Sequence, residues 1–336
     1  MKRQKQYIAG NYPDTFTASS KAKLDAEEIL KNLGFSNCGL SQSHIPAKTP
    51  KAYLRLIRSI MKTALSMSKN GILFLQHPCS ADIRYAKIAK KRNNKIILLI
   101  HDLNHLRDWN DKGELELIEM ADVIIVHTSE MAQLLKSYGI DKEFVVLEIF
   151  DYLHGSTVPE RNNNNIKVAF AGNLGKSKFL EKIKFENINL NLYGIGGENK
   201  EYQRGIEYKG CFPPDKLAEN MEADYGLVWD GDSIQECTGQ LGEYLRIIAP
   251  HKLSMYLSAK LPVIVWSESA MAKFVEKYNV GITISSLEEI EKKLPPINSK
   301  EYEILKNNVN DISHKLSEGY FLTKALDKAI RLLNAN

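Results

Sequence analysis

Cysteine is scarce in this chain of 336 residues, and no Cys-x-x-Cys pair is present. The four cysteines lie far apart, at Cys38, Cys79, Cys211 and Cys237. This spacing argues against a zinc knuckle and against a disulfide framework, which both need cysteines at short, regular intervals. We therefore expect reduced thiols in the protein core.

The sequence also lacks a long apolar run and a strong net charge. No apolar stretch reaches the roughly 20 residues that cross a bilayer, and the basic start at residues 1–6 leads into a short strand instead of a signal peptide. The formal charge is only +4, and no basic motif interleaved with aromatic residues is present. We expect a cytoplasmic protein with no nucleic-acid partner.

What the sequence does have is an alternation of short apolar strands and helical patterns, in two sets. Strands that are apolar throughout are typical of parallel sheets covered on both faces. The predicted strands are residues 6–10, 71–76, 95–100 and 121–126 in the first set, and 166–171, 188–193, 225–229 and 263–266 in the second. Residues 151–165, with four consecutive asparagines, are predicted as a linker. The pattern predicts an α/β protein with Rossmann-like domains at 1–152 and 153–315 and a terminal helix at 316–336.

One segment of the second set joins a basic helix start to a buried strand. Pro250 suits a first helical position, Lys252 adds a charge beside the amides of the first turn, and Pro262 ends the helix before a β-branched run. A helix start with a cation is typical of an anion site. An ordinary α/β unit with a solvated basic end is the alternative.

Residues 250–266 are similar to the P-x-K-L-x-x-Y-x-A-x-G-x-P-V-I segment in the donor-binding half of GT-B glycosyltransferases. The chain as a whole resembles bacterial β-1,6-galactofuranosyltransferases and the related glucosyltransferases that extend adhesin glycans. This resemblance implies a GT-B fold, with two Rossmann-like domains facing each other across a cleft and a C-terminal helix that crosses back to the first. Met255 replaces a ribose-binding Glu of many members, and Lys260 replaces a Gly.

The resemblance also implies contacts to a UDP-sugar at the strand ends of the second domain. Residues 171–177 end like a Walker loop, but Phe170 stands where its first glycine is required, so we interpret them as a turn facing the diphosphate or as a plain structural turn. The predicted donor-binding residues are Gly172, Asn173, Lys176, Lys178, Tyr193, Phe212, Trp229, Asp230, His251, Lys252 and Tyr256.

Asp230-Gly231-Asp232 follows a strand, as do the metal-binding carboxylates of GT-A transferases. A second Rossmann-like pattern surrounds the pair here, so we favour a place for Asp230 in the donor pocket. We predict that no metal or other cofactor is required, with metal binding by the pair as the alternative.

His101 and Asp102 end an apolar strand of the first domain and resemble the I-H-D strand end of the same transferase branch. Glycosyl transfer needs a base that takes a proton from the acceptor hydroxyl. We predict Asp102 in this role, oriented by His101, with Asp14 in the loop after the first strand as the second candidate. A hydrogen-bonded structural pair is the alternative.

A helix predicted over residues 51–69 has Leu54, Ile57, Met61 and Leu65 on one face and basic residues elsewhere. Such a helix could rest on an anionic membrane that carries a lipid-linked acceptor. We favour the alternative, a helix docked on the first domain with a solvated basic face.

Together these patterns predict a glycosyltransferase that moves a hexose from a UDP-sugar to a hydroxyl of an acceptor glycan in cell-surface polysaccharide or glycoprotein synthesis. Galactofuranose is the preferred sugar, by resemblance alone. The alternatives are a GT-B-shaped nucleotide-sugar epimerase and a non-catalytic partner of another transferase. We also expect a homo-oligomer.

Overall fold

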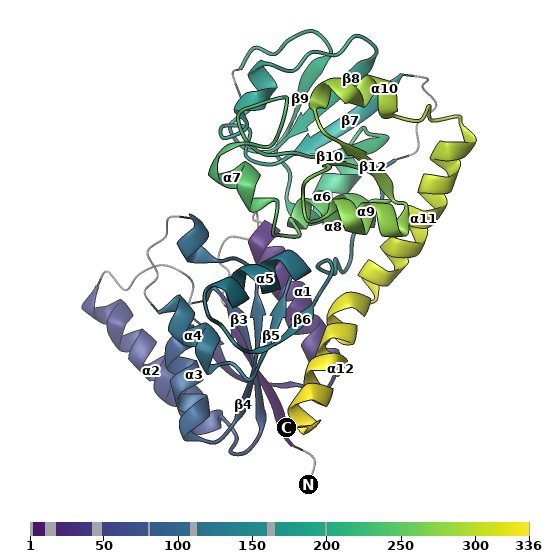
Figure 1. Cartoon of the computed structure of the whole chain (residues 1–336). Coiled ribbons are helices and arrows are strands. Elements are labelled where there is room, and N and C mark those ends of the chain that lie inside the picture. The colour runs from purple at the N-terminus through teal and green to yellow at the C-terminus, as the bar shows by residue number, and fades with distance from the viewer. Residues whose placement is uncertain are drawn as a thin grey trace. The chain divides into compact units, whose positions relative to one another are not determined.

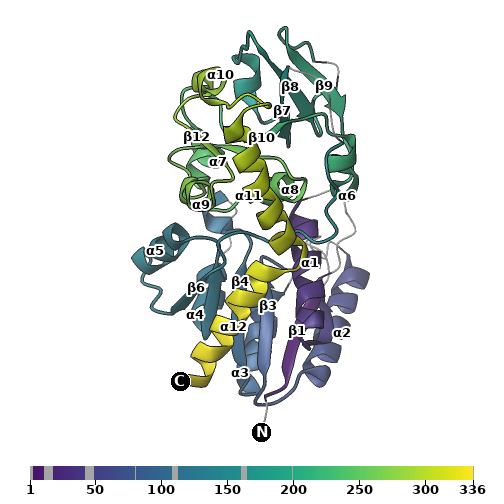
Figure 2. The same cartoon turned by 90° about the vertical axis from the view of Figure 1, so that its right-hand side faces the viewer.

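The computed structural model describes residues 3–10, 18–41, 49–79, 81–107, 113–159, 165–198 and 200–335. These residues form two compact α/β units, and each unit contains a six-stranded sheet in which every paired strand is parallel to its neighbours (Figures 1 and 2). The first unit includes Ser19–Leu147 and the C-terminal segment from Phe321, and the second includes Glu148–Tyr320.

The sheet of the first unit has the strand order β2-β1-β3-β4-β5-β6. Its strands are β1 (Lys5–Gly10), β2 (Ser36–Ser41), β3 (Ile72–His77), β4 (Lys95–Ile100), β5 (Val123–Val126) and β6 (Glu143–Val146). The central strands β3 and β5 are buried along their whole length, and β4 is buried from its second residue. Helices therefore cover both faces of this sheet, as the apolar runs predict.

The helices of the first unit connect these strands by parallel crossovers, except the last helix, which follows all the strands and packs on the unit from the end of the chain. They are α1 (Ala18–Asn32), α2 (Pro50–Ser66), α3 (Asp82–Lys91), η1 (Asn104–Arg107), α4 (Glu114–Met120), α5 (Ser129–Ser137) and α12 (Tyr320–Ala335). α1 and α12 lie on one side of the sheet, and α3 and α4 lie on the other (Figures 1 and 2), as right-handed crossovers in opposite directions require. Arg3 Nη1 donates to Leu333 O (3.2 Å) and ties the two ends of this unit together.

The sheet of the second unit has the strand order β12-β11-β10-β7-β8-β9. Its strands are β7 (Ile166–Ala171), β8 (Ile188–Tyr193), β9 (Ile206–Gly210), β10 (Tyr225–Val228), β11 (Val263–Trp266) and β12 (Gly281–Ile284). Its helices are η2 (Lys178–Glu181), α6 (Pro214–Leu217), η3 (Ala218–Asn220), α7 (Gly239–Tyr244), α8 (His251–Ser258), α9 (Ala272–Tyr278), η4 (Leu287–Glu289), α10 (Ile290–Lys293) and α11 (Lys300–Ser317). The chain winds outward from β7 through β8 and β9, then returns to β10 on the other side of β7. A switch of direction therefore lies between β7 and β10, which is where ligands bind in open parallel sheets.

The predicted anion-binding segment forms α8 and β11, with two differences from expectation. Pro250 precedes α8 as its N-cap, with ψ of 135°, instead of occupying the first helical position. Lys260 has a left-handed backbone, with φ of 63°, at the position where similar sequences have Gly. A side chain in this conformation costs about 1 kcal/mol, and Lys306 Nζ holds the Lys260 carbonyl at 2.7 Å.

The first residues of the segment predicted as a linker are packed into the second unit. Asp151, Tyr152 and Leu153 are buried, Tyr152 N donates to Leu316 O (3.3 Å), and Ser254 Oγ donates to Phe150 O (2.7 Å). The contact boundary between the units lies at residues 147 and 148, before this segment.

Candidate functional site

A pocket of about 320 Å³ opens at the carboxyl ends of the strands of the second unit. Three strand ends contribute to it, through the turns that follow β7, β8 and β9, and the first residues of α8 complete it. Of the predicted donor-binding residues, the pocket brings together Gly172, Asn173, Tyr193, Phe212, His251 and Lys252. The pocket therefore lies beside the switch of direction in the sheet, where a ligand site is expected.

Backbone hydrogen bonds hold the three turns of this pocket close together. Gly172 N donates to Tyr193 O, and Gly194 N donates to Gly210 O, both at 2.9 Å. Gly194 has a φ of 128°, and a Cβ on it would lie 1.9 Å from the Gly172 carbonyl oxygen. The close approach of these two turns therefore requires glycine at position 194.

The turn at residues 171–177 differs from the expected cradle of amides. Leu174 N donates to Ile195 O (2.9 Å), and Lys176 N donates to Asn173 O (3.1 Å). Gly175 N donates to the Asn173 side chain (3.1 Å). These amides stabilise the turn itself, so the positive charge available to an anion comes from α8 and its lysine.

Lys252 is held at the switch between β7 and β10 by three contacts. Its Nζ donates to Asp230 Oδ2 (2.9 Å) and to Trp229 O (3.3 Å) at the end of β10. The same atom lies 5.1 Å from the centre of the Phe170 ring of β7. The ammonium group is thus oriented in advance, and an anionic ligand would share it with Asp230.

Aromatic and apolar side chains form the walls of the pocket. The partly exposed Phe212 has its ring centre 6.5 Å from that of the fully buried Tyr193, and Tyr152 and His251 have ring centres 5.2 Å apart. Met255 also lines the pocket, at the position where the resemblance described above implies a Glu. Flat rings on the walls suit a nucleobase, and a thioether in place of the carboxylate removes a strong hydrogen-bond acceptor.

Two of the predicted donor-binding residues lie in the core beneath the pocket. Tyr256 is fully buried, its Oη accepts a hydrogen bond from Ala171 N (2.7 Å), and burial raises the pKa of its hydroxyl. Trp229 is also fully buried, and its Nε1 donates to Ser233 O (3.0 Å). Both side chains lie behind the turns that form the pocket and support them. Neither side chain lines the pocket.

The two predicted lysines of the turn also lie outside the pocket lining. Lys178 Nζ is 3.6 Å from Asp232 Oδ2, and both side chains are exposed. Lys176 is exposed as well. Each carboxylate of Asp230-Gly231-Asp232 is therefore next to a lysine. Within the described ranges, no group of three or more His, Cys, Asp or Glu side chains is arranged to hold a metal ion.

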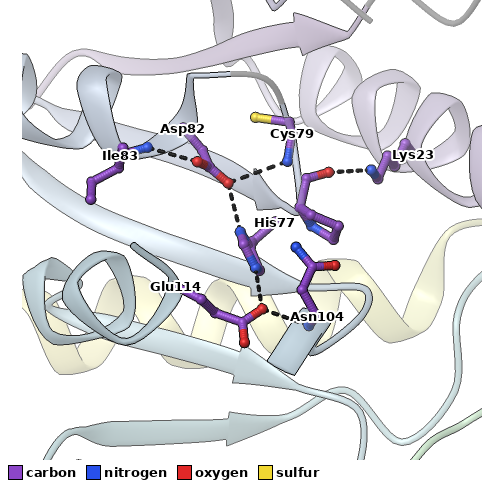
Figure 3. Close-up of polar contacts among 8 residues, drawn as sticks. Lys23, His77, Cys79, Asp82, Ile83, Asn104 and Glu114 are labelled. Atoms are coloured by element: carbon purple, nitrogen blue, oxygen red, sulfur yellow. Dashed lines mark hydrogen bonds and ion pairs between the residues drawn. The ribbon is translucent and has the colours of Figure 1, made fainter. Parts of the chain in front are cut away.

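A second cluster of polar residues lies at the carboxyl ends of β3 and β4 in the first unit (Figure 3). His77 is buried between two carboxylates, with Nδ1 2.6 Å from Asp82 Oδ2 and Nε2 2.7 Å from Glu114 Oε1. Burial alone would lower the pKa of His77, but hydrogen bonds to the two carboxylates and their negative charges raise it to about 9. The imidazole is therefore a cation at neutral pH.

This charged clamp fixes the loops that follow both strands. Asp82 accepts hydrogen bonds from the backbone of Cys79 (3.2 Å), and Glu114 accepts one from the backbone of Asn104 (2.7 Å) (Figure 3). Lys23 of α1 is also buried, and its Nζ donates to the Pro78 carbonyl. The loop that carries Asp102 lies between these anchored points.

The predicted acceptor residues have different environments. His101 is buried, and its Nε2 donates to Gln76 Oε1 (2.8 Å). Asp102 is partly exposed, and its charge raises the pKa of Lys23, against the larger lowering by burial. Asp14 lies outside the described residues. Asp102 is thus the more accessible of the two described groups, and the buried Lys23 side chain lies near it.

Sequence reasoning noted His77 only as the polar end of an apolar strand, missed Lys23, Asp82 and Glu114, and placed Tyr152 in the linker. The polar end of β3 can be recognised in the sequence. Lys23 and Glu114 occur inside ordinary helical patterns, which give no signal that these side chains are buried. The contacts that join them span 55 residues from Lys23 to Pro78 and 37 from His77 to Glu114. Only the folded sheet brings these groups together.

Comparison with known proteins assigns both units. Residues 5–149 match the family model of the glucosyltransferase 3-like N-terminal domain, and residues 168–329 match that of the C-terminal domain. The chain belongs to the glucosyltransferase 3-like family of glycosyltransferases. It is 32% identical to a beta-1,6-galactofuranosyltransferase of Escherichia coli, over 70% of this chain and 71% of that protein. It is 24% identical to glucosyltransferase 3 of Streptococcus gordonii, over 92% and 93% of the two chains.

Solved structures of glycosyltransferases share the fold of this family member. The TM-score is 0.59 with sucrose-phosphate synthase from Thermosynechococcus elongatus, at 11% identity, over 98% of this chain and 100% of the other. It is 0.60 with an alpha-glucosyltransferase in complex with UDP-glucose and DNA containing an abasic site, at 12% identity, over 99% and 100%. The GT-B fold and the glycosyltransferase class predicted from the sequence are confirmed.

The clamp of the first unit predicts an unusual histidine titration. An NMR titration of His77 should have its midpoint near pH 9 instead of 6.5. Because the folded-state pKa is the higher one, the imidazolium contributes stability that is complete below about pH 6.5 and is lost as the pH rises through about 9. Glu114→Gln should lower the midpoint, since it removes one of the two anionic partners.

Glu116→Gln provides the matched control, because Glu116 is on the same helix but is exposed and paired with Lys87. This substitution should leave the midpoint of His77 unchanged. A midpoint near pH 6.5 in the unsubstituted protein would show that the imidazole is not held as a cation.

Proposed function

We propose that this glycosyltransferase binds the UDP part of a UDP-sugar in the pocket of the second unit. The observation that carries the proposal is the combination, in one pocket at the sheet's switch of direction, of a positioned lysine with aromatic walls. Lys252 would contact the diphosphate, and the base would lie against the partly exposed Phe212, whose ring packs near the buried Tyr193. This division matches the chemistry of a nucleoside diphosphate, which is charged at one end and flat and apolar at the other.

The donor sugar is proposed to be galactofuranose. The support is the 32% identity to the beta-1,6-galactofuranosyltransferase, which exceeds the 24% and 27% identities to the two glucosyltransferases. UDP release should therefore be faster with UDP-galactofuranose than with UDP-glucose, and it should depend on a glycan acceptor. Equal or greater release with UDP-glucose would overturn the choice of sugar without affecting the transferase class.

The acceptor is proposed to be a glycan hydroxyl positioned beside Asp102 in the first unit. In a transfer that inverts the anomeric centre, Asp102 would take the hydroxyl proton as the oxygen attacks the anomeric carbon, and the bond from that carbon to the diphosphate would break. Lys252 would stabilise the negative charge that develops on the departing UDP. The His77 clamp and Lys23 would hold the Asp102 loop in place. A cytoplasmic location and a homo-oligomer stay predictions.

The donor proposal can be tested by calorimetric titration with UDP. A charged hydrogen bond contributes about 1.5–3 kcal/mol, so Lys252→Ala should weaken UDP binding by roughly tenfold or more. Asp230→Asn should maintain or strengthen binding, because it keeps the ammonium group and removes the anion that competes for it. Unchanged affinity in Lys252→Ala would remove the basis for the donor site.

Lys178→Ala tests the turn separately, because it removes the same charge from an exposed position outside the pocket lining. A loss of UDP affinity as large as that in Lys252→Ala would show that Lys178 also contacts the diphosphate.

Transfer is proposed to need no divalent metal, because the lysine and the start of α8 supply the positive charge. EDTA should leave the rate of UDP release from UDP-galactofuranose, measured with a glycan acceptor, unchanged. Loss of turnover on chelation, with recovery on adding Mg²⁺ or Mn²⁺, would instead assign a metal to Asp230 and Asp232.

The role of Asp102 predicts a separation of binding from catalysis. Asp102→Asn keeps the shape of the side chain and removes its basicity, so turnover should fall by about 10²–10⁴-fold. UDP affinity should persist, because the UDP pocket belongs to the other unit. A near-normal rate in Asp102→Asn with a collapse in Asp14→Asn would transfer the role to the loop after β1.

A further inference from the structure

Helix α2 of the first unit has apolar side chains on its outer face. Tyr53 is 50% exposed, Leu54 54%, Met61 60% and Leu65 80%. A single exposed leucine is common on protein surfaces. A cluster of large apolar side chains on one helix face instead marks an interaction surface. The sequence interpretation of α2 as an ordinary docked helix does not account for this face.

The opposite face of α2 holds the helix on the unit. α2 contacts the edge strand β2 and helix α3. Thr63 is buried, and a Cβ on Gly39 of β2 would lie 2.0 Å from its hydroxyl oxygen, so helix and strand approach closely. Leu56 and Ile60, on the same side as Thr63, are partly buried. The outer apolar residues are therefore additional to those that dock the helix.

The outer face also has an ordered distribution of charge. At 100° per residue, its apolar side chains, from Tyr53 to Leu65, fall within an arc of about 120°. The basic side chains of α2 occupy the next arc of about 60°. These are Lys51, Arg55, Arg58 and Lys62. The sequence of α2 contains no Asp or Glu. Apolar and basic stripes side by side are typical of a helix lying in a membrane interface.

The basic groups of α2 differ from those of its neighbour α3. On α3, Lys87 pairs with Glu116 (2.8 Å) and Lys90 with Asp122 (2.6 Å). Among the residues that the structure describes, none of the four basic side chains of α2 takes part in an ion pair. Their charge is therefore available to an external anion.

We propose that α2 rests on the surface of an anionic phospholipid membrane, with its apolar stripe in the interface and its basic stripe at the lipid phosphates. Charge complementarity favours lipid over a second copy, because a symmetric contact between two α2 helices would bring like charges together. No helix in the described ranges is long and apolar enough to cross a membrane. The proposal extends the proposed function by bringing the first unit to lipid-linked acceptors, but its test uses neither donor nor acceptor.

Vesicle co-sedimentation with the whole protein tests this surface. The protein should bind vesicles of phosphatidylcholine mixed with phosphatidylglycerol, should not bind phosphatidylcholine alone, and should be released by salt. Each basic residue near an anionic surface strengthens binding about fivefold, so Arg55→Gln/Arg58→Gln/Lys62→Gln should weaken it on the order of 100-fold. Lys292→Gln/Lys300→Gln/Lys328→Gln removes the same charge from exposed positions elsewhere and should have little effect.

The apolar stripe has its own matched pair of variants. Leu54→Ser/Leu65→Ser should weaken vesicle binding by about tenfold, whereas Ile304→Ser, at a site 52% exposed on α11, should not. UDP affinity should stay unchanged in all variants, which also shows that they are folded.

Three results would overturn the proposal. The first is no binding to vesicles with phosphatidylglycerol. The second is an equal loss of binding in the α2 variants and in their controls, which would indicate general electrostatic attraction. The third is an oligomer that Leu54→Ser/Leu65→Ser converts to a monomer, which would assign the surface to a second copy. None of these results would affect UDP binding, so a failure here is distinct from a failure of the donor site.

Discussion

Parallel pairing of every strand constrains where chemistry can occur in this protein. In each sheet the strands all end at the same edge, so the turns after them gather their polar side chains there. In the second unit this edge places Lys252 over the ring of Phe170 and beside Asp230. In the first unit it places His77 between two carboxylates. Both candidate sites depend on residues that are distant in the sequence and become neighbours through this one rule.

The sequence predicted the interior of both sheets and missed their edges. The predicted strands correspond to β1, β3, β4 and β5 in the first unit and to β7, β8, β10 and β11 in the second. The remaining strands, β2, β6, β9 and β12, are the outermost strands of the two sheets. An edge strand has a partner on one side only and tolerates polar residues, as in Ser36–Ser41 of β2 and Ile206–Gly210 of β9. Apolar runs identify strands that are covered on both faces.

The candidate donor site was predicted better than its supports. Lys252 and His251 were located by a helix-start pattern, which is local in sequence and needs no knowledge of the sheet. Trp229 was placed in the pocket because it follows a strand, and Tyr256 because it belongs to the segment that resembles the donor-binding motif, but both are buried beneath the pocket. Burial depends on which face of an element meets the core, and no local pattern distinguished these residues from the partly exposed Phe212. The contact of Lys252 with the Phe170 ring depends on β7 lying beside β10, which the sequence does not state.

The last helix makes the first unit discontinuous along the chain. Phe321, Leu326 and Leu333 of α12 are buried, and α12 from Phe321 onward belongs with residues 19–147. A ribosome therefore completes the second unit before it supplies the helix that covers one side of the first sheet. Until then, the domain that was begun first exposes apolar surface, and the domain that was begun second can already fold. The first unit therefore acquires its complete set of residues last, although its synthesis starts first.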